Sequence, residues 1–371
     1  MEATLPRRPR VIPGLPVLRR RSDEIQIGLD PRLAAVVSGL PEPVVAAVQQ
    51  LSGQHGADEL VAGLGEHGST LRELLHALTA RGLVEDASRS AGPLPGRLAG
   101  DQSAAAMRVA VDAGRGPDHG GSPAARRGLA VAVEGDGRLG VSLAALLAGA
   151  GVGWVHVLAT GTVRPEDTGT GYLADDVGRR RSIAAREAVQ RVDGGVRTSR
   201  FSVNNGPDLV VLTDAVVPEP GRVGALTSAG VPHLNVRMRD GIGIVGPLVV
   251  PGLTSCLRCA DLQRCDRDAC WPQLAAQLAG KIQPADLAST QATAAFAVGQ
   301  VLDAVRWLKG SAGPPTTCDA SVELDLGTAG VRHRAWPAHP ACSCGAAGRC
   351  SNVAADTMEE LRESSCDGDA S

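Results

Sequence analysis

Four cysteines form two closely spaced pairs that could together bind a metal ion. Cys256 and Cys259 are separated by two residues, and Cys342 and Cys344 are separated by one. Four thiolates presented on two tight turns suit the tetrahedral coordination of Zn²⁺. Because four protein ligands leave no open position for water or substrate, the spacing predicts a structural zinc site rather than a catalytic one. Such a site would link the first pair to a hairpin near the C-terminus.

The remaining cysteines show no ligand spacing, and we expect each to be a small buried or surface thiol: Cys265, Cys270, Cys318, Cys350 and Cys366. All nine cysteines lie in the C-terminal third of the chain, and in a reducing compartment this clustering favours metal binding over disulfides. A Cys-x-x-Cys pair can also be a redox motif when it begins a helix. We expect the pair at 256–259 in a loop rich in Pro and Gly, which argues against redox chemistry.

A glycine-rich turn provides a candidate phosphate site. Gly135, Gly137 and Gly140 fit the pattern G-x-G-x-x-G between an apolar run and a helical pattern. Such glycines allow a tight turn and let backbone N–H groups at a helix N-terminus approach an anion. The alternative is the same strand–turn–helix unit with an empty pocket, and the sequence leaves both open. No acidic residue for a ribose follows the second strand at 157–160, which argues against an NAD-dependent dehydrogenase.

Alternating apolar runs and helical patterns predict an α/β domain with a parallel sheet. The run at 129–133 is apolar throughout, as in a strand that is buried on both faces. We expect strands at 129–133, 154–158, 208–214 and 232–236, helices at 139–150 and 289–309, and a late hairpin at 321–326 and 331–336. This order is typical of a Rossmann-like fold.

The N-terminal part shows a hairpin and three short helical patterns, which together are typical of a winged helix. The hairpin covers 11–29 and turns at Ser22-Asp23. The first two helices are expected at 43–51 and 58–64. The third is expected to begin with a capping box of Thr70 and Glu73, to bury a face of leucines, and to end at Gly82.

The chain is too long for one ordinary domain, and its composition changes along the sequence. We expect a winged-helix domain at 1–86, a flexible linker at 87–127, the Rossmann-like domain at 128–350 and a disordered tail at 351–371. Hydrophobic residues make up 43% of the chain and aromatic residues only 2%, so both cores must be aliphatic. The sequence shows no signal peptide and no apolar stretch of membrane length, which predicts a cytoplasmic protein without membrane contact.

Together these motifs resemble the ThiF family, which includes the ubiquitin-activating-like adenylyltransferases. The resemblance rests on the glycine turn at 135–140, on Thr213-Asp214, on the segment 255–268 around the first cysteine pair, and on the segment 339–344 around the second. More narrowly, the chain is similar to actinobacterial proteins of the bacteriocin cyclodehydratase type. Those proteins bind the leader of a thiazole/oxazole-modified microcin precursor.

The resemblance also implies partners and site residues. Segments 8–10, 13–15 and 29–31 are similar to the PqqD-type precursor-recognition winged helix, so the wing and the third helix would hold a leader peptide. The family implies a homodimer and a partner enzyme of the YcaO type that does the chemistry. By position, the residues of a nucleotide site would be the loop glycines Gly135, Gly137 and Gly140, the Mg²⁺/ATP aspartate Asp214, and the phosphate-contacting Arg181.

The sequence departs from the active adenylyltransferases of this family at two places. Where they show Asp-x-Asp-x-Val after the second strand, this chain has Ala-Thr-Gly-Thr-Val at 159–163. Where they show Asn-Leu-x-Arg-Gln, it has Asp-Thr-Gly-Thr-Gly at 167–171. Losing several charge-assisted hydrogen bonds, each of about 1.5–3 kcal/mol, would remove useful affinity for ATP. We therefore expect a degenerate ATP/Mg²⁺ site, no catalytic residue, and a protein that binds and presents a peptide without adenylating it.

Two other functions are compatible with the sequence. Asp214 and the glycine turn would suit an active ATP-dependent adenylyltransferase. A winged helix would suit a DNA-binding regulator, but the net charge is −3 and the third helix offers few basic residues, so nucleic-acid binding is disfavoured. The basic run Arg19-Arg20-Arg21 on the hairpin is either a docking surface for an acidic leader or a charged edge that prevents aggregation. For a peptide ligand, Arg72 and His76 of the third helix would face it as well.

Overall fold

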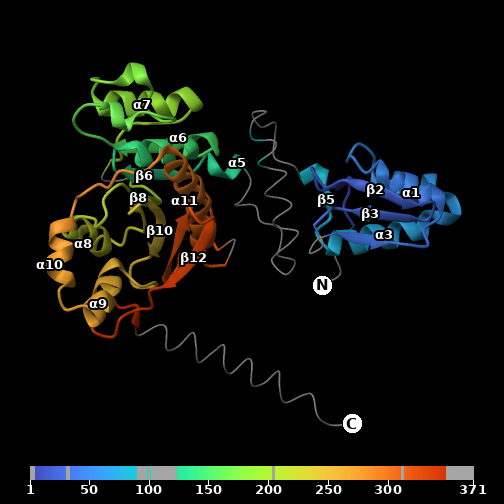
Figure 1. The fold of residues 1–371 in the computed structure, drawn as a ribbon. Helices are drawn as coiled ribbons and strands as arrows, with labels where there is room; N and C mark the ends of the chain where they lie inside the picture. Colours follow the sequence, from blue (N-terminus) through green and yellow to red (C-terminus); the bar gives the residue numbers. More distant parts are fainter. Residues whose placement is uncertain are drawn as a thin grey trace, which may run out of the picture. The chain divides into compact units, whose positions relative to one another are not determined.

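The computed structural model describes residues 5–30, 34–89, 98, 101, 123–202, 205–310 and 313–347. The chain divides into two compact units, 1–125 and 126–371 (Figure 1). The expected tail, most of the expected linker, Cys350 and Cys366 lie outside the described residues. No helix in the described part of the chain is long and apolar enough to span a membrane.

The predicted N-terminal hairpin is present and belongs to a three-stranded antiparallel sheet. Its strands are β2 (Val17–Arg21) and β3 (Glu24–Ile27), which are joined by a turn at Ser22-Asp23. β4 (Ala35–Val37) pairs with the other side of β3, so β2 and β4 are the two edges of this sheet. A separate two-stranded sheet pairs β1 (Pro9–Val11) with β5 (Val84–Asp86) and connects the beginning of the unit to its end.

The N-terminal unit also contains the three predicted helices, α1 (Glu42–Gln49), α2 (Ala57–Gly63) and α3 (Gly68–Ala80). The leucine face of α3 is confirmed, and its buried members are Leu71, Leu74, Leu75 and Leu78. The predicted capping box is wrong. A 3₁₀ turn at Gly65–His67 runs directly into α3, so Thr70 lies inside the first turn and no side chain caps the helix.

The second unit is built on one seven-stranded sheet in the order β12-β11-β10-β9-β8-β6-β7. Its parallel half consists of β7 (Trp154–Leu158), β6 (Ala130–Glu134), β8 (Leu209–Leu212) and β9 (His233–Arg239). These are the four strands that the sequence predicts. Because they are parallel, their carboxyl ends meet at one end of the sheet, where a doubly wound fold places its ligand.

The other half of the sheet is antiparallel. It consists of β10 (Ile242–Val249), β11 (Ala320–Asp325) and β12 (Gly330–Ala335). β11 and β12 form the predicted late hairpin. The sequence analysis missed β10, although Asp-Gly between two apolar runs is a strong hairpin signal. Asp240 and Gly241 both adopt positive φ, 52° and 80°, as a tight hairpin turn requires.

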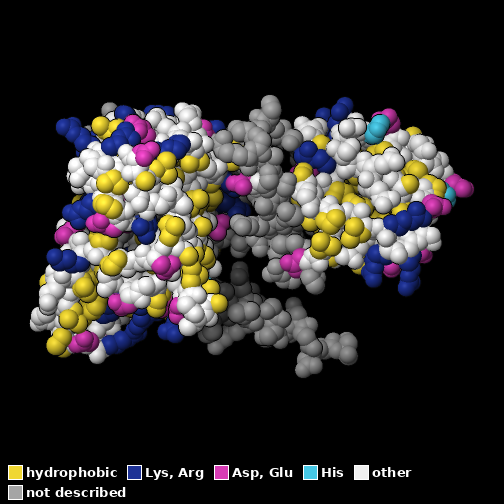
Figure 2. Space-filling model, turned by 45° about the horizontal axis from the view of Figure 1, so that its top comes forward, with side chains coloured by type: hydrophobic (Ala, Val, Ile, Leu, Met, Phe, Trp, Pro, Cys, Tyr) yellow, Lys and Arg dark blue, Asp and Glu magenta, His cyan; other side chains and the backbone are white. Residues whose placement is uncertain are grey.

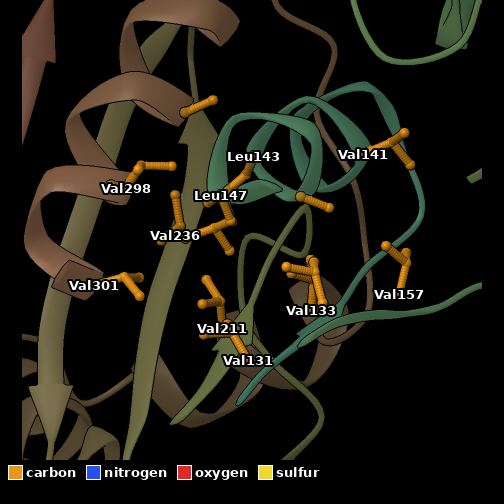
Figure 3. Close-up of a cluster of buried hydrophobic side chains, with 14 of the residues drawn as sticks. Val131, Val133, Val141, Leu143, Leu147, Val157, Val211, Val236, Val298 and Val301 are labelled. Carbon is orange, nitrogen blue, oxygen red and sulfur yellow. The ribbon is translucent and has the colours of Figure 1, made fainter. Parts of the chain in front are cut away.

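Helices cover both faces of the seven-stranded sheet. α6 (Arg138–Gly149) and α11 (Leu287–Leu308) pack on one face, and α7 (Arg181–Val192) packs against α6 (Figure 1). Figure 3 shows valines of the parallel strands lying beside Leu143 and Leu147 of α6 and Val298 and Val301 of α11. This core is aliphatic, as the composition requires.

The opposite face of the sheet is covered by α8 (Pro220–Ser228) and α9 (Leu257–Arg267). Alternate residues of β6 and β8, Ala132, Val210 and Leu212, point to this side and contact the smaller core there. The remaining elements are short: α5 (Pro123–Arg126), α10 (Trp271–Leu278) and 3₁₀ turns at Ala87–Arg89, Pro165–Asp167 and Ala174–Asp176.

Candidate functional site

The four predicted ligand cysteines lie together although they come from two distant segments. Cys256 directly precedes α9 and Cys259 lies in the first turn of that helix, whereas Cys342 and Cys344 follow β12. All four Sγ atoms lie within 4.8 Å of one another. The Sγ–Sγ distances are 3.8 Å from Cys256 to Cys259, 3.6 Å from Cys256 to Cys342 and 3.5 Å from Cys259 to Cys344.

This spacing fits a tetrahedral metal ion. Four sulfurs that each lie about 2.3 Å from a zinc ion stand roughly 3.8 Å apart. The observed distances agree with that value, and the cluster could bind a metal such as zinc. The hydrogen bond between the two thiols lowers the pKa of Cys259 and raises that of Cys256, so the proton they share stays on Cys256.

The structure overturns one premise of the sequence analysis, because the first cysteine pair begins a helix instead of lying in a loop. A cysteine pair at a helix N-terminus would by itself suit redox chemistry. The argument against a redox role therefore comes from Cys342 and Cys344, which complete a set of four sulfurs. The other described cysteines, Cys265, Cys270 and Cys318, lie outside that set.

Gly135, Gly137 and Gly140 form the turn between β6 and α6. Gly137 directly precedes the helix, and Gly135 has a φ of 138°. A Cβ atom at Gly135 would lie 2.0 Å from Oγ1 of Thr213, and one at Gly140 would lie 2.3 Å from the carbonyl oxygen of Gly135. The glycines are therefore required by the close packing of the end of β8 against the turn, whatever the turn binds.

Asp214 fills the N-terminus of α6. It follows β8 with a φ of 71° and is buried. Its Oδ2 accepts a hydrogen bond from the Gly137 N–H at 2.9 Å, and its Oδ1 accepts a longer one from the Gly140 N–H at 3.4 Å. Burial raises the pKa of Asp214, and these hydrogen bonds oppose the rise. The N–H groups that could bind a phosphate thus already hold a carboxylate of the chain itself.

Arg181, the first residue of α7, is held by two carboxylates. Its guanidinium donates to Asp136 at 2.8 Å and also to Asp167. Asp136 accepts a further hydrogen bond from the backbone N–H of Thr160 at 2.6 Å, which ties the glycine turn to the segment after β7. Sequence reasoning missed both acids. Asp136 could have been noticed as a charged residue inside the glycine motif, whereas Asp167 carries no local signal.

Comparison with known proteins was made at the level of sequence and of fold. No protein-family profile and no curated protein matches the sequence. E. coli MccB with ATP matches the fold with a TM-score of 0.65 at 14% identity, over 91% of this chain and 99% of that chain. E. coli MccB with MccA-N7isoASN gives 0.65 at 15% identity, over 91% and 99%. PaaA gives 0.63 at 17% identity, over 87% and 98%.

The chain has a ThiF-type fold. This confirms the resemblance stated from the motifs at the level of fold. The second unit makes up only about two thirds of the chain, so a match over 91% of the chain extends the similarity into the N-terminal unit.

The residues expected to hold ATP in this ThiF-type fold do not fit a triphosphate as they are arranged. Asp214 takes the anion position at α6, and Asp136 and Asp167 neutralise Arg181. Ala159 and Gly161, after β7, supply no carboxylate for a ribose. A phosphate placed at the start of α6 would have to displace the Asp214 carboxylate. If both groups stayed, two negative charges a few ångströms apart would repel each other strongly where water is scarce.

The residues expected to contact a peptide lie on the N-terminal unit, and most are already paired. Arg19 of β2 pairs with Glu42 of α1 at 2.8 Å. Arg20 and Arg21 lie 3.5 and 4.0 Å from Glu24 of β3. Arg72 of α3 lies 4.0 Å from Asp58 of α2, and His76 is exposed on the same helix. Arg19 thus pairs with a residue of α1, and Arg72 pairs with a residue of α2.

Proposed function

We propose that this protein binds a ribosomally made precursor peptide and presents it to a partner enzyme in the biosynthesis of a thiazole/oxazole-modified, bacteriocin-type product, without adenylating the peptide. Its partners would be the leader of the precursor, a YcaO-type enzyme and a second copy of the chain. The fold similarity supports a role with peptides, because MccB has been crystallised with MccA-N7isoASN and with N-formylated MccA.

One observation carries the non-adenylating part of the proposal. The carboxylate of Asp214 accepts hydrogen bonds from the N–H groups of the glycine turn, where a phosphate would have to bind. Asp136 and Asp167 likewise accept hydrogen bonds from Arg181, the expected phosphate contact, and neutralise its charge. The site is satisfied by side chains of the chain itself, so ATP would gain little by replacing them.

The leader would bind by adding a strand to β2. This strand is an edge of its sheet, and an edge presents unpaired N–H and C=O groups that an extended peptide can match. The ion pairs of Arg19, Arg20 and Arg21 are exposed, so each is worth little and acidic residues of a leader could replace them. Arg72 and His76 would contact a leader long enough to reach α3.

The four-cysteine cluster would hold one structural zinc ion. Such an ion would join the start of α9 to the segment after β12 and supply no open coordination position. Its contribution would be to the stability of the second unit and to the placement of α9 on the sheet.

The second candidate function is an active adenylyltransferase. It is favoured by the fold similarity to MccB with ATP and by the presence of the glycine turn and Asp214 in this chain. A DNA-binding regulator has no comparable support. Figure 2 shows Lys and Arg side chains interspersed with Asp and Glu on the face in view of both units, and the net charge is −3.

Two measurements on the full-length protein test the proposal. Calorimetric titration with the leader of a precursor encoded beside this gene should show binding that weakens with salt, because exposed charges are screened over about 8–10 Å. Reversal of Arg19, Arg20 and Arg21 to Glu should remove it, whereas reversal of exposed Arg164, Arg186 and Arg332 in the second unit should not. ATP–pyrophosphate exchange should be absent with and without the peptide. ATP–pyrophosphate exchange that depends on Asp214 would instead show that the protein is an active adenylyltransferase.

A further inference from the structure

The free edge of β2 has regular strand geometry over a short stretch. The strand pairs with β3 in a continuous register from Val17 to Arg19. A bulge between Arg19 and Arg21 interrupts this register, and Pro16, directly before the strand, has no backbone N–H. An extended peptide that adds to this edge therefore meets a regular strand at three residues, Val17, Leu18 and Arg19.

The backbone groups of Val17 and Arg19 point away from β3. The Gly28 N–H donates to the carbonyl oxygen of Pro16 at 2.9 Å, so these two opposed residues form a hydrogen-bonded pair. Hydrogen-bonded and non-hydrogen-bonded pairs alternate along an antiparallel ladder. Leu18 therefore directs its N–H and C=O groups towards β3, whereas Val17 and Arg19 direct theirs towards the free edge. Each of these two residues presents one donor and one acceptor to the backbone of a peptide.

The side chains of this stretch alternate between the two faces of the sheet. Val17 packs against the core of the N-terminal unit. Arg19, two residues further on, lies on the same face and reaches Glu42 of α1 at 2.8 Å. Leu18 points to the opposite, outer face, where it is 40% exposed. The edge thus presents an apolar residue at the border of the core, an exposed apolar residue on the outer face, and a cation.

These three side chains select the chemistry of an added strand. Directly opposed side chains of two paired strands lie on the same face, with Cβ atoms about 4.5–5.5 Å apart. An apolar side chain opposite Val17 would extend the core, and another one opposite Leu18 would cover the exposed leucine. A carboxylate opposite Arg19 would replace Glu42, whose side chain is 72% exposed, so the existing ion pair is worth little.

We propose that β2 selects leaders that contain an acidic residue followed by two large apolar residues, as in Glu-Leu-Val. The leader adds in antiparallel orientation, with the acidic residue opposite Arg19 and the two apolar residues opposite Leu18 and Val17. The antiparallel orientation is favoured because antiparallel pairing is slightly more stable per residue than parallel pairing. This specificity rests on the proposed function, which places a leader peptide at β2.

Binding of two designed peptides to the full-length protein tests the charged contact. The first probe is Ser-Thr-Ser-Glu-Leu-Val-Ser-Thr-Ser with an N-terminal fluorescein and a C-terminal amide, and the second carries Lys in place of Glu. Fluorescence anisotropy should show that the Glu peptide binds about fivefold more tightly, because an opposite-charge pair replaces a like-charge pair at Arg19. Arg19→Glu should reverse this preference. An Arg19→Glu protein that still prefers the Glu peptide, or that binds neither probe, refutes the contact.

Leu18→Ser and Val36→Ser are a matched pair of variants that tests the apolar contact. Both residues are opposed to Gln26 of β3, so they lie on the outer face of the same sheet, but they belong to its two different edge strands. Their exposed fractions are similar, 40% and 45%. Leu18→Ser should weaken binding of the Glu peptide about fivefold, and Val36→Ser should not. Equal effects of the two substitutions, or no effect of either, refute the motif.

Failure of this motif is distinguishable from failure of the proposed function. If the leader encoded beside this gene binds and depends on Arg19, Arg20 and Arg21, but the protein does not discriminate between the two probes, the motif alone is refuted. If that leader does not bind, the proposed function is refuted, whatever the probes do.

Discussion

The backbone N–H of Gly137 donates a hydrogen bond of 2.9 Å to the Oδ2 of Asp214 and thereby binds a carboxylate at the N-terminus of α6. The two residues belong to neighbouring parallel strand–loop units, β6–α6 and the end of β8. The contact uses N–H groups at a helix N-terminus, a position that favours an anion.

Asp214→Ala should free this anion position. We expect the variant to lose about 1–2 kcal/mol of unfolding free energy, because a helix loses its capping carboxylate. Inorganic phosphate should then stabilise the variant more than it stabilises the unmodified protein. Denaturation in urea with and without phosphate measures both effects.

Asp175→Ala is the control for that experiment, since Asp175 is exposed on a surface turn and should change neither property. Loss of a measurable ATP affinity in Asp214→Ala would contradict the prediction, because it would mean that the carboxylate assists a nucleotide instead of replacing it.

Arg181→Met should be strongly destabilising. The substitution leaves the carboxylates of Asp136 and Asp167 without their shared cation, and both side chains are largely buried. We expect a loss of about 3 kcal/mol in the free energy of unfolding, measured by chemical denaturation. Arg180→Met, at the exposed neighbouring position, should cost less than about 0.5 kcal/mol. Equal losses of unfolding free energy in the two variants would show that the ion pairs of Arg181 with Asp136 and Asp167 do not stabilise the fold.

Cys256→Ser should release the metal and destabilise the second unit. The purified protein should contain about one zinc per chain, and the variant much less, because three thiolates bind zinc more weakly than four. Metal analysis and thermal unfolding provide the two readouts. Cys265→Ser, on the same helix but outside the cluster, should retain both the zinc and the Tm. A protein that keeps its zinc after Cys256→Ser would rule out this ligand set.

The N-terminal unit should lose stability in acid through Asp86. Burial opposes ionisation of this carboxyl, but hydrogen bonds from Ser88, Arg7 and Arg8 outweigh it and lower the pKa of Asp86 to about 2. Because the pKa is lower in the folded state, the stabilisation is complete above pH 4 and is lost as pH falls towards 2. We expect about 1–2 kcal/mol after allowing for solvent screening.

Asp86→Asn is the test of that assignment. The variant should be less stable than the unmodified protein at pH 7 and should converge with it near pH 2, as followed by unfolding at a series of pH values. Parallel stability curves at all pH values would contradict a lowered pKa for Asp86.

The sequence by itself determined several of the elements and the four cysteines that could bind a metal. Strands buried on both faces require continuous apolar runs, so β6 and β8 are visible without any knowledge of their neighbours. The leucine spacing of α3 and the paired cysteines are likewise local patterns. β10 is predictable in the same way, because the Asp240-Gly241 turn that precedes it is a local hairpin signal.

Only the tertiary structure decided what occupies the candidate nucleotide site. Asp136 and Asp167, the partners of Arg181, are far apart in the sequence. Asp214 follows β8 and contacts Gly137 at the end of the neighbouring strand β6. Ion pairs and hydrogen bonds depend on distances of a few ångströms, whereas sequence patterns report burial and periodicity along one segment at a time.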